Sequence, residues 1–561
     1  AVRWRMPVSF DSKVLDGMRW TLARRMRCAW SSRMMAPSIL DQLDKHKLED
    51  EDKVVLHDGQ QFISFVDSRQ AAAKATLKQN LEQERMWFYT VIYHELCRRA
   101  AEASKYEEEA ARLKKIRDSY DDDSDEWEEA HKAWKKVRAK LNKHITWMEI
   151  ADIISKDKYC PVFCSLFIKR SGDSEELDKD GNIPQEIMER YIQSIMVMYL
   201  ANRPSSAAAP ETLGLFHTCY PQLKSIQLPP EVERFNDLMD NPANGIDKND
   251  WRNLIQVFMD YTVRSNQSVF LRIPGNNDID IFRCVRFATE KPRRRPVSKP
   301  KLEQGRISNS RIVRYLCGLI MRDDSTMTLK DAQTNCFPEI EGVVNALWDT
   351  LNDPNNKLLE DSVSLDETGT WHADRDDACR FNLVNLSFQL YEDVYLCDAT
   401  NDGEERHTKC LRPIETNFKR FSPYLAAGKP VELNEDLHET SWAPYPYYAG
   451  NEKQEANKEL LDEWAKTNRK LLWNNHLWGE NGVFTYHLEE IHLVPNLFIQ
   501  AEHTAQVDKD VARELQGDFK NHAINILACS TTMEMGVDLG NLEVVMLSSV
   551  PPMPANYKQR A

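Results

Sequence analysis

The sequence contains no apolar run that approaches the roughly 18 residues needed to span a membrane, and no signal-peptide pattern opens it. Its twelve cysteines follow no regular spacing, and several, such as Cys97 and Cys529, lie in apolar surroundings. These absences argue against a membrane protein and against a secreted disulfide scaffold, and they predict a cytoplasmic protein. The chain begins with Ala1 rather than Met, which predicts a natural N-terminus elsewhere.

A second absence concerns phosphate chemistry. No Gly-x-x-x-x-Gly-Lys-Ser/Thr loop occurs anywhere, and no Asp-Glu-x-His motif follows a buried strand. The chain therefore lacks the two motifs with which P-loop enzymes hold nucleotide phosphates and Mg²⁺, and we expect it not to hydrolyse ATP on its own.

The composition is that of a soluble protein, with 42% hydrophobic and 29% charged residues, and 561 residues predict three or four domains. A net charge of −15 argues against nucleic acid covering every face. The net negative charge is compatible with local clusters of Lys and Arg, because nucleic acid contacts only part of a protein surface. Two occur, at 1–36 and at 286–306, and the second includes Arg293, Arg294 and Arg295. Solvated linkers are the alternative interpretation.

A repeated pattern predicts an α/β fold with a parallel sheet. The apolar run Phe62–Val66 ends at Asp67, and an Ala-rich, helix-favouring stretch follows. The same order recurs at Ile524–Thr532, and Val544–Leu547 supplies a further buried strand. More than 400 residues separate these pieces, which is far too long for a loop.

The intervening segment reads as mainly helical. Residues 84–155 predict a helical hairpin, and the order helix, helix, β-hairpin within 308–398 predicts a winged-helix module. In that module Ile312–Ile320 and Ile340–Leu351 are the expected helices, and Phe381–Leu386 is the expected strand region.

Polar side chains follow three predicted strands, which are Phe62–Val66, Leu497–Ile499 and Ile524–Cys529. Ligands gather at the carboxyl ends of parallel strands, where helix N-termini offer free N–H groups to phosphates. Candidate phosphate contacts are therefore Ser68, Arg69, His503, Thr504, Thr531 and Thr532. Ordinary helix capping is the alternative for each.

These segments resemble the motifs of one enzyme class. Phe62–Gln70 resembles motif IV of superfamily 2 helicases, and Ala501–Thr504 resembles motif IVa. Ser530–Asp538 resembles motif V, and Gln559–Ala561 resembles the start of motif VI. The finer resemblance is to the MrfA-like large bacterial helicases, including the anti-phage defence helicases of Druantia and DISARM systems, with the long insertion favouring Druantia.

The resemblance implies roles for matched residues. Ser68, Arg69, His503, Thr504, Thr531 and Thr532 would contact the nucleic-acid backbone. Gly536, Asp538, Gln559 and Arg560 would line the nucleotide cleft. It further implies that ATP and Mg²⁺ are bound mainly by a first RecA-like domain absent from this sequence, and that the arginine fingers follow Ala561.

The predicted architecture is a RecA-like parallel sheet split by a large, mainly α insertion. Its parts are 1–56, a basic lead-in; 57–83, the first part of the second RecA-like domain; 84–155, the helical hairpin; 156–307, a helical insertion with a basic linker; 308–398, the winged-helix module; 399–490, a connecting segment; and 491–561, the remainder of the RecA-like domain, truncated in motif VI.

The function implied is that of part of an ATP-dependent DNA helicase or translocase in bacterial anti-phage defence. Its expected partners are DNA, the remaining domains of the same protein and other defence-system subunits. A non-catalytic interaction scaffold and an RNA helicase are the alternatives.

No metal site is expected. Cys160 and Cys164 are one residue too far apart for the usual zinc knuckle and read as core cysteines. A zinc site from Cys397, His407 and Cys410 is the weaker alternative, because their spacing is irregular.

Overall fold

The computed structural model of the chain divides into two compact units, Ala1–Thr90 with Tyr486–Ala561, and Val91–Thr485. The structure describes residues 36, 39–40, 43, 56–66, 69–121, 124–171, 183–201, 210, 215–265, 269–273, 297, 299–308, 310–324, 326–356, 358–361, 363–365, 371–373, 379–390, 393–396, 400–401, 408–409, 413–414, 439–441, 497–504, 507–530 and 544–547.

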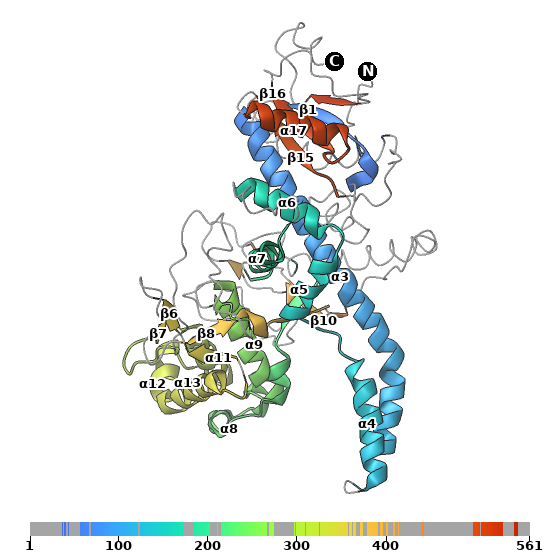
Figure 1. Cartoon of the computed structure of the whole chain (residues 1–561). Coiled ribbons are helices and arrows are strands. Elements are labelled where there is room, and N and C mark those ends of the chain that lie inside the picture. Colours follow the sequence, from blue (N-terminus) through green and yellow to red (C-terminus); the bar gives the residue numbers. More distant parts are fainter. Residues whose placement is uncertain are drawn as a thin grey trace, which may run out of the picture. The chain divides into compact units, whose positions relative to one another are not determined.

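The first unit is built on a four-stranded parallel sheet. Its strands are β15 (Gln500–His503), β16 (Ile526–Ser530), β1 (Phe62–Val66) and β17 (Val545–Leu547), hydrogen-bonded in that spatial order. A strand from the start of the chain thus lies between two strands from its end, as the blue and red ribbons of Figure 1 show. The predicted parallel sheet is confirmed.

Apolar side chains explain why these segments pair. Phe62 and Ile526, directly opposite in register, form a buried cluster with Phe498, Ala36 and Leu40. Further along the same face, Ala528 packs against Ala72 of the long helix α3 (Arg69–Arg117). Small residues at this contact let the helix lie close to the sheet. The basic lead-in predicted for 1–56 therefore includes apolar residues that pack onto the sheet.

A left-handed turn, η1 (Leu56–Gly59), delivers the chain into β1. His57, Asp58 and Gly59 all have positive φ, at 48°, 47° and 73°. Only glycine adopts this region without a steric cost, which is about 1–2 kcal/mol for other residues. The turn persists because side chains hold it: Asn525 donates to the carbonyls of Leu56 and Gln60, at 2.9 and 3.0 Å.

The outer edge of β15 is closed by polar side chains of α3. The Asn80 carboxamide donates to the Gln500 carbonyl and accepts from the Gln500 N–H, at 2.9 and 3.0 Å. It thus pairs with the strand as a neighbouring strand would. One turn either way, Thr76 accepts from the Gln500 side chain and Gln83 accepts from the Phe498 N–H. This buried row protects an edge that would otherwise invite pairing with another chain.

Replacing Asn80 by Ala is expected to lower the free energy of opening at this edge by about 2 kcal/mol, because a buried N–H and carbonyl lose their partners. Hydrogen exchange at the amides of 498–503 measures the change. Gln70→Ala removes an exposed carboxamide from the same helix and should change it by less than about 0.5 kcal/mol. Equal protection in the two variants would contradict the pairing role.

The second unit is mainly helical. α3 continues into it without a break. The other α-helices in its described residues are α4 (Asp125–Ala139), α5 (Trp147–Lys156), α6 (Cys160–Ser171), α7 (Gln185–Met196), α8 (Pro230–Asn236), α9 (Lys248–Ser265), α11 (Arg311–Asp323), α12 (Leu329–Asn335) and α13 (Phe337–Asn352).

The small strands of this unit pair locally. β9 (Ser387–Gln389) lies between β2 (Ile145–Thr146) and β3 (His217–Cys219), and β8 (Cys379–Asn382) lies between β4 (Val269–Phe270) and β5 (Glu360–Asp361). Two further sheets have two strands each: β6 (Val363–Leu365) pairs with β7 (Trp371–Ala373), and β11 (Thr400–Asn401) pairs with β12 (Thr408–Lys409). In a three-stranded sheet, β10 (Asp393–Leu396) lies between β13 (Pro413–Ile414) and β14 (Glu439–Ser441).

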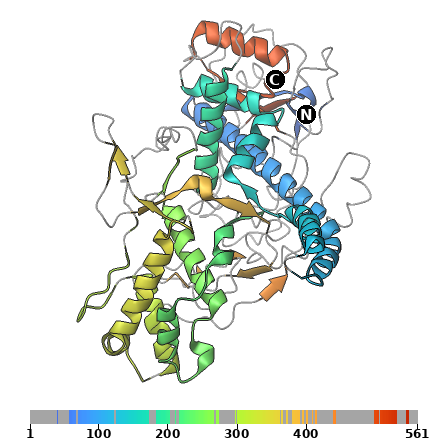
Figure 2. The same cartoon turned by 60° about the horizontal axis from the view of Figure 1, so that its bottom comes forward.

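The helices predicted near 312–320 and 340–351 are confirmed as α11 and α13, which pack with α8 and α12 (Figures 1 and 2). The predicted strand region Phe381–Leu386 is wrong in detail. β8 ends at Asn382, a 3₁₀ turn covers Leu383–Asn385, and β9 then joins a different sheet. The Asn382 side chain accepts from the Val384 N–H, a local bond by which asparagine favours a turn over a strand.

Candidate nucleic-acid interface

The parallel register brings the carboxyl ends of the strands to one edge of the sheet. Val66 is level with Ser530, and His503 is level with Cys529. The residue that follows each strand therefore emerges at the same edge. The sequence predicted this convergence, and the register confirms it for β1, β15 and β16.

The turn from β1 to α3 is two residues long, because β1 ends at Val66 and α3 begins at Arg69. No acidic residue lies in the first turn of α3. Its first-turn N–H groups and positive dipole end thus meet no carboxylate of their own helix, while Asp67, which precedes the helix, lies outside the described residues. Arg69 occupies the first helical position; its side chain and Ser68 lie outside the described residues.

His503 is the last residue of β15, whereas the sequence predicted a strand at Leu497–Ile499 and His503 beyond it. The ring is half-buried, and its Nε2 accepts from the Gln516 carboxamide of α17 (Lys509–Lys520) at 2.8 Å. Burial lowers the pKa of His503 below its ordinary value. The imidazole is therefore neutral at pH 7, so it offers a phosphate no positive charge.

Thr504 is buried, and its hydroxyl donates to Glu502 Oε1 at 2.8 Å. Its carbonyl accepts from the Val507 N–H, which turns the chain toward α17. A phosphate contact from this hydroxyl would compete with the bond to Glu502.

The N-terminus of α17 differs from that of α3. Asp508 caps it by accepting from the Asp510 N–H, and Asp510 adds a second carboxylate in the first turn. These charges already complement the helix dipole and would repel an anion. Between the two helices, α3 is the one whose own first turn contains no acidic residue.

The other predicted contacts lie outside the described residues: Thr531, Thr532, Gly536, Asp538, Gln559, Arg560, Arg293, Arg294 and Arg295. Thr531 and Thr532 directly follow Ser530, the last residue of β16, in the sequence.

Cys160 and Cys164 are buried on α6, and the Cys160 thiol donates to the Met188 sulfur at 3.4 Å. Burial raises the pKa of Cys160 to about 12, so in this environment the sulfur is a thiol. Both behave as the core cysteines that the sequence predicted. Within the described residues no three His, Cys, Asp or Glu side chains gather as a metal site would need. Cys397, His407 and Cys410 lie outside them.

Two features of the structure were not predicted from the sequence. The polar row that closes β15 gives no local signal, because its partners are about 420 residues away. A charge signal was present in the helical hairpin, where 110–117 and 131–141 hold nine Lys and Arg and no Asp or Glu.

None of the helices in the described part of the chain is long and apolar enough to cross a membrane.

Residues 483–561, which supply three of the four strands of the sheet, match the helicase conserved C-terminal domain. That family and the parallel sheet support a superfamily 2 helicase domain of RecA-like α/β fold in this part of the chain.

Two curated proteins are similar to short parts of this chain. A 38-residue stretch is 58% identical to Druantia protein DruE of Escherichia coli, covering 7% of this chain and 2% of that protein. A 104-residue stretch is 28% identical to the ATP-dependent helicase Lhr-Core of Sulfolobus acidocaldarius, covering 18% of this chain and 12% of that protein. The similarity thus spans a small part of either relative. No solved structure matches the chain.

Proposed function

We propose that this chain is part of an ATP-dependent superfamily 2 DNA helicase or translocase, and that it grips the nucleic-acid backbone and forms one side of the ATP cleft. The observation that carries the proposal is the sheet itself. Two of its strands within the helicase-like 483–561, β16 and β17, pair in parallel with β1, and β15 pairs with β16. The helix α3, which follows β1, has no acidic residue in its first turn. ATP and Mg²⁺ are the proposed cofactors, held mainly by a first RecA-like domain elsewhere in the protein.

The proposed grip uses groups at the carboxyl edge of the sheet. Thr531 and Thr532 follow β16, and Ser68 and Arg69 lie at the start of α3, so their hydroxyl, guanidinium and N–H groups can hold successive phosphates. Such contacts do not read the bases and weaken with salt. The neutral, already bonded His503 is assigned a supporting position at this edge.

The domain boundaries expected from the sequence are part of the proposal, with the helical segment as an insertion in the RecA-like domain. The order α11, α12, α13, followed by the antiparallel strands β5 and β8, supports a winged-helix module in 308–398. Arg293, Arg294 and Arg295 are proposed to add backbone contacts beside it.

The role in anti-phage defence is proposed from the similarity to the Druantia protein. It places the protein in the bacterial cytoplasm with other defence-system subunits as partners.

Replacing Thr531 and Thr532 together by Ala in the full-length protein is expected to reduce the apparent DNA affinity in an ATPase assay by roughly 100-fold or more. Each hydroxyl bond to a charged phosphate contributes about 1.5–3 kcal/mol, and 1.4 kcal/mol is a factor of ten. DNA-stimulated ATP hydrolysis should be lost at DNA concentrations that saturate the unaltered protein.

The matched control is Ser155→Ala with Thr334→Ala, two exposed helical hydroxyls that bond only within their own helices. Stimulation should be unchanged in it. Full stimulation in the Thr531 and Thr532 variant would remove the proposed grip. Stimulation by RNA alone would replace DNA as the substrate, and no hydrolysis with either would favour the scaffold alternative.

A further inference from the structure

The second unit carries a helical arm, formed by 103–117 of α3 and the antiparallel helix α4. Ala103 and Ala110, seven residues apart on α3, are buried, as is Val137 of α4. Lys140 lies over the Tyr106 ring at 4.1 Å, and Lys143 pairs with Glu107 at 3.1 Å. The small buried residues let the helices lie close together, so most of the longer side chains point outward.

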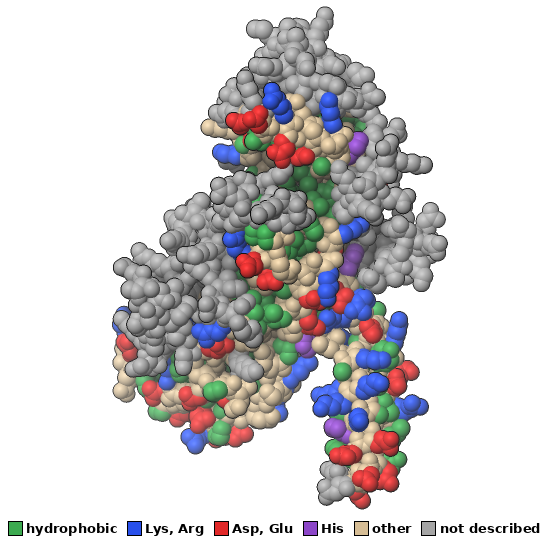
Figure 3. Space-filling model, viewed as in Figure 1, with side chains coloured by type: hydrophobic (Ala, Val, Ile, Leu, Met, Phe, Trp, Pro, Cys, Tyr) green, Lys and Arg blue, Asp and Glu red, His purple; other side chains and the backbone are tan. Residues whose placement is uncertain are grey.

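Charge is segregated along this arm. Its middle holds Arg112, Lys114, Lys115, Arg117, Lys132, Lys135, Lys136, Arg138 and Lys140, here called the basic band. All are exposed except the half-buried Arg117. The tip is acidic, with Asp118, Asp121, Asp125, Glu126, Glu128 and Glu129. Figure 3 shows Lys and Arg side chains over the middle of the arm and Asp and Glu at its tip.

The separation is unusual for this chain, in which acidic residues outnumber basic ones by 88 to 73. Lys156, on another helix, has an acidic neighbour, Asp152, at 2.6 Å. Within the band no Asp or Glu interrupts the sequence on either helix. Arg117 pairs with Asp118, and Glu102 and Glu109 act on Lys140, but the net charge of the band is positive.

Aromatic rings fix part of the band. Trp134 lies against two guanidinium groups, with the Arg117 and Arg138 carbons 4.3 and 4.7 Å from the ring centroid. Arg117 also pairs with Asp118. His131 stacks on Trp127 at 4.6 Å and tilts toward Trp134 at 5.7 Å. These rings are occupied by one another and by arginines, so they are not a platform for stacking bases.

We infer that the basic band binds the phosphate backbone of double-stranded DNA. The surface is a convex rod without open aromatic faces, which suits phosphates rather than bases. From Lys132 to Lys140 the helix rises about 12 Å. A duplex presents about seven phosphate charges over that length, a number similar to the charge of the band. This inference rests on the proposed function, since it names the duplex as the part of the DNA substrate that the arm holds.

The test is equilibrium binding of the whole chain to a fluorescent 20-base-pair DNA duplex, without nucleotide, over a series of salt concentrations. The variant is Lys115→Gln, Lys132→Gln, Lys135→Gln and Lys136→Gln, since glutamine keeps the helix propensity of lysine. We expect the affinity to fall at least ~10-fold at low salt. The slope of log affinity against log salt should shrink by up to about 3.6, because each phosphate contact contributes about 0.9.

The matched control removes four exposed charges outside the band: Lys156→Gln, Lys158→Gln, Lys248→Gln and Lys330→Gln. It should bind the duplex as the unaltered chain does. Thermal unfolding and helicity confirm that both variants fold.

Equal affinity and slope in the band variant and the control would overturn the inference. So would tighter binding to a single strand of the same length than to the duplex. A loss of self-association by the band variant, with DNA binding unchanged, would assign the band instead to the acidic tip of a second copy. Because no nucleotide is present, failure of ATP hydrolysis in the full-length protein would overturn the proposed function without deciding this test.

Discussion

Replacing Asn525 by Leu is expected to lower the free energy of opening of the four-stranded sheet by about 4 kcal/mol. Asn525 is fully buried, and its carboxamide makes three bonds to backbone groups. It accepts from the Ile499 N–H at 2.9 Å and donates to the carbonyls of Leu56 and Gln60. Leucine fills the same space but satisfies none of these groups, and each buried group left unpaired costs about 1–3 kcal/mol.

Asn525 matters because of where its partners lie. It joins the entry to β15 with the left-handed turn before β1, so one side chain fixes both strands at the amino end of the sheet. His522 Nδ1 donates to the Gly59 carbonyl at 2.8 Å and supports the same turn. The alignment of β1 and β15 also determines how their carboxyl ends, where phosphates are proposed to bind, lie relative to each other.

The measurement is hydrogen exchange at the amides of β1 and β16, since a chain with two units does not unfold as a single two-state system. The control is Asn521→Leu, an exposed asparagine whose backbone N–H makes its bonds to Gly517 and Phe519. It should change protection by less than about 0.5 kcal/mol. Equal exchange rates in the two variants would show that the three bonds do not hold the sheet together.

Local apolar pattern was enough to predict the inner strands. Phe62–Val66 forms β1, Ile526–Ser530 falls in the predicted apolar run, and α11 covers the predicted 312–320. In each case the apolar residues of the segment are enough to predict that it is buried, so contacts with residues distant in sequence are not needed for the prediction.

The edge strand was misplaced for the converse reason. Apolarity favoured Leu497–Ile499, whereas β15 is Gln500–His503 and starts with a buried glutamine. Gln500 can be buried only because Thr76 and Asn80 satisfy its polar groups, and they lie more than 400 residues away. The turn at His57 and Asp58 is similar, since its positive φ values depend on Asn525 rather than on local sequence.

The sequence predicted where the candidate site lies in the sheet, but it did not predict which bonds its side chains make. The strand order brings the carboxyl ends together as expected, since that follows from parallel pairing alone. The sequence could not show that Gln516 engages His503 or that Glu502 engages Thr504. Nor could it rank α3 above α17 as a phosphate site, because that distinction depends on where each helix begins.

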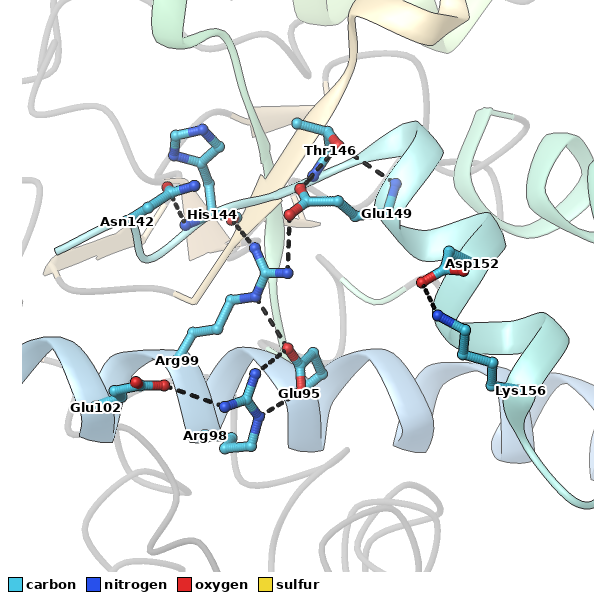
Figure 4. A network of polar contacts seen from close by, with 10 residues as sticks. All are labelled: Glu95, Arg98, Arg99, Glu102, Asn142, His144, Thr146, Glu149, Asp152 and Lys156. Atoms are coloured by element: carbon cyan, nitrogen blue, oxygen red, sulfur yellow. Dashed lines mark hydrogen bonds and ion pairs between the residues drawn. The ribbon is translucent and has the colours of Figure 1, made fainter. Parts of the chain in front are cut away.

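The root of the arm provides the second large expected effect. Arg99 of α3 donates to Glu95 at 3.0 Å, to the His144 carbonyl at 2.9 Å and to Glu149 at 2.9 Å. Glu149 in turn completes a capping box with Thr146 at the start of α5 (Figure 4). One guanidinium therefore ties α3 to the segment that follows the arm.

Replacing Arg99 by Met is expected to cost about 3 kcal/mol of local stability at pH 7, because three charge-assisted bonds are lost at a side chain only 18% exposed. The matched control is the adjacent Arg98→Met. Arg98 is 48% exposed and pairs with Glu95 and Glu102 of its own helix, so its loss should cost less than about 1 kcal/mol. Hydrogen exchange at the amides of α5 and of 95–103 measures both.

Acid is expected to lower the local stability at the root of the arm. In Arg99→Met the local stability should depend less on pH. Burial alone raises the pKa of Glu149, but the Thr146 N–H, Arg99 and the Thr146 hydroxyl together lower it below its ordinary value. Burial likewise raises the pKa of Glu95, but the hydrogen bonds and charges of Arg98 and Arg99 outweigh burial and lower this pKa below its ordinary value. A carboxylate with a lowered folded-state pKa stabilises fully above its unfolded value of about 4.3 and loses that contribution as pH falls through the folded value. Protection of α5 against hydrogen exchange in the unaltered chain should therefore decline below about pH 5, and more steeply than in Arg99→Met. Parallel pH profiles in the two proteins would mean that Arg99 does not lower the pKa of these carboxylates.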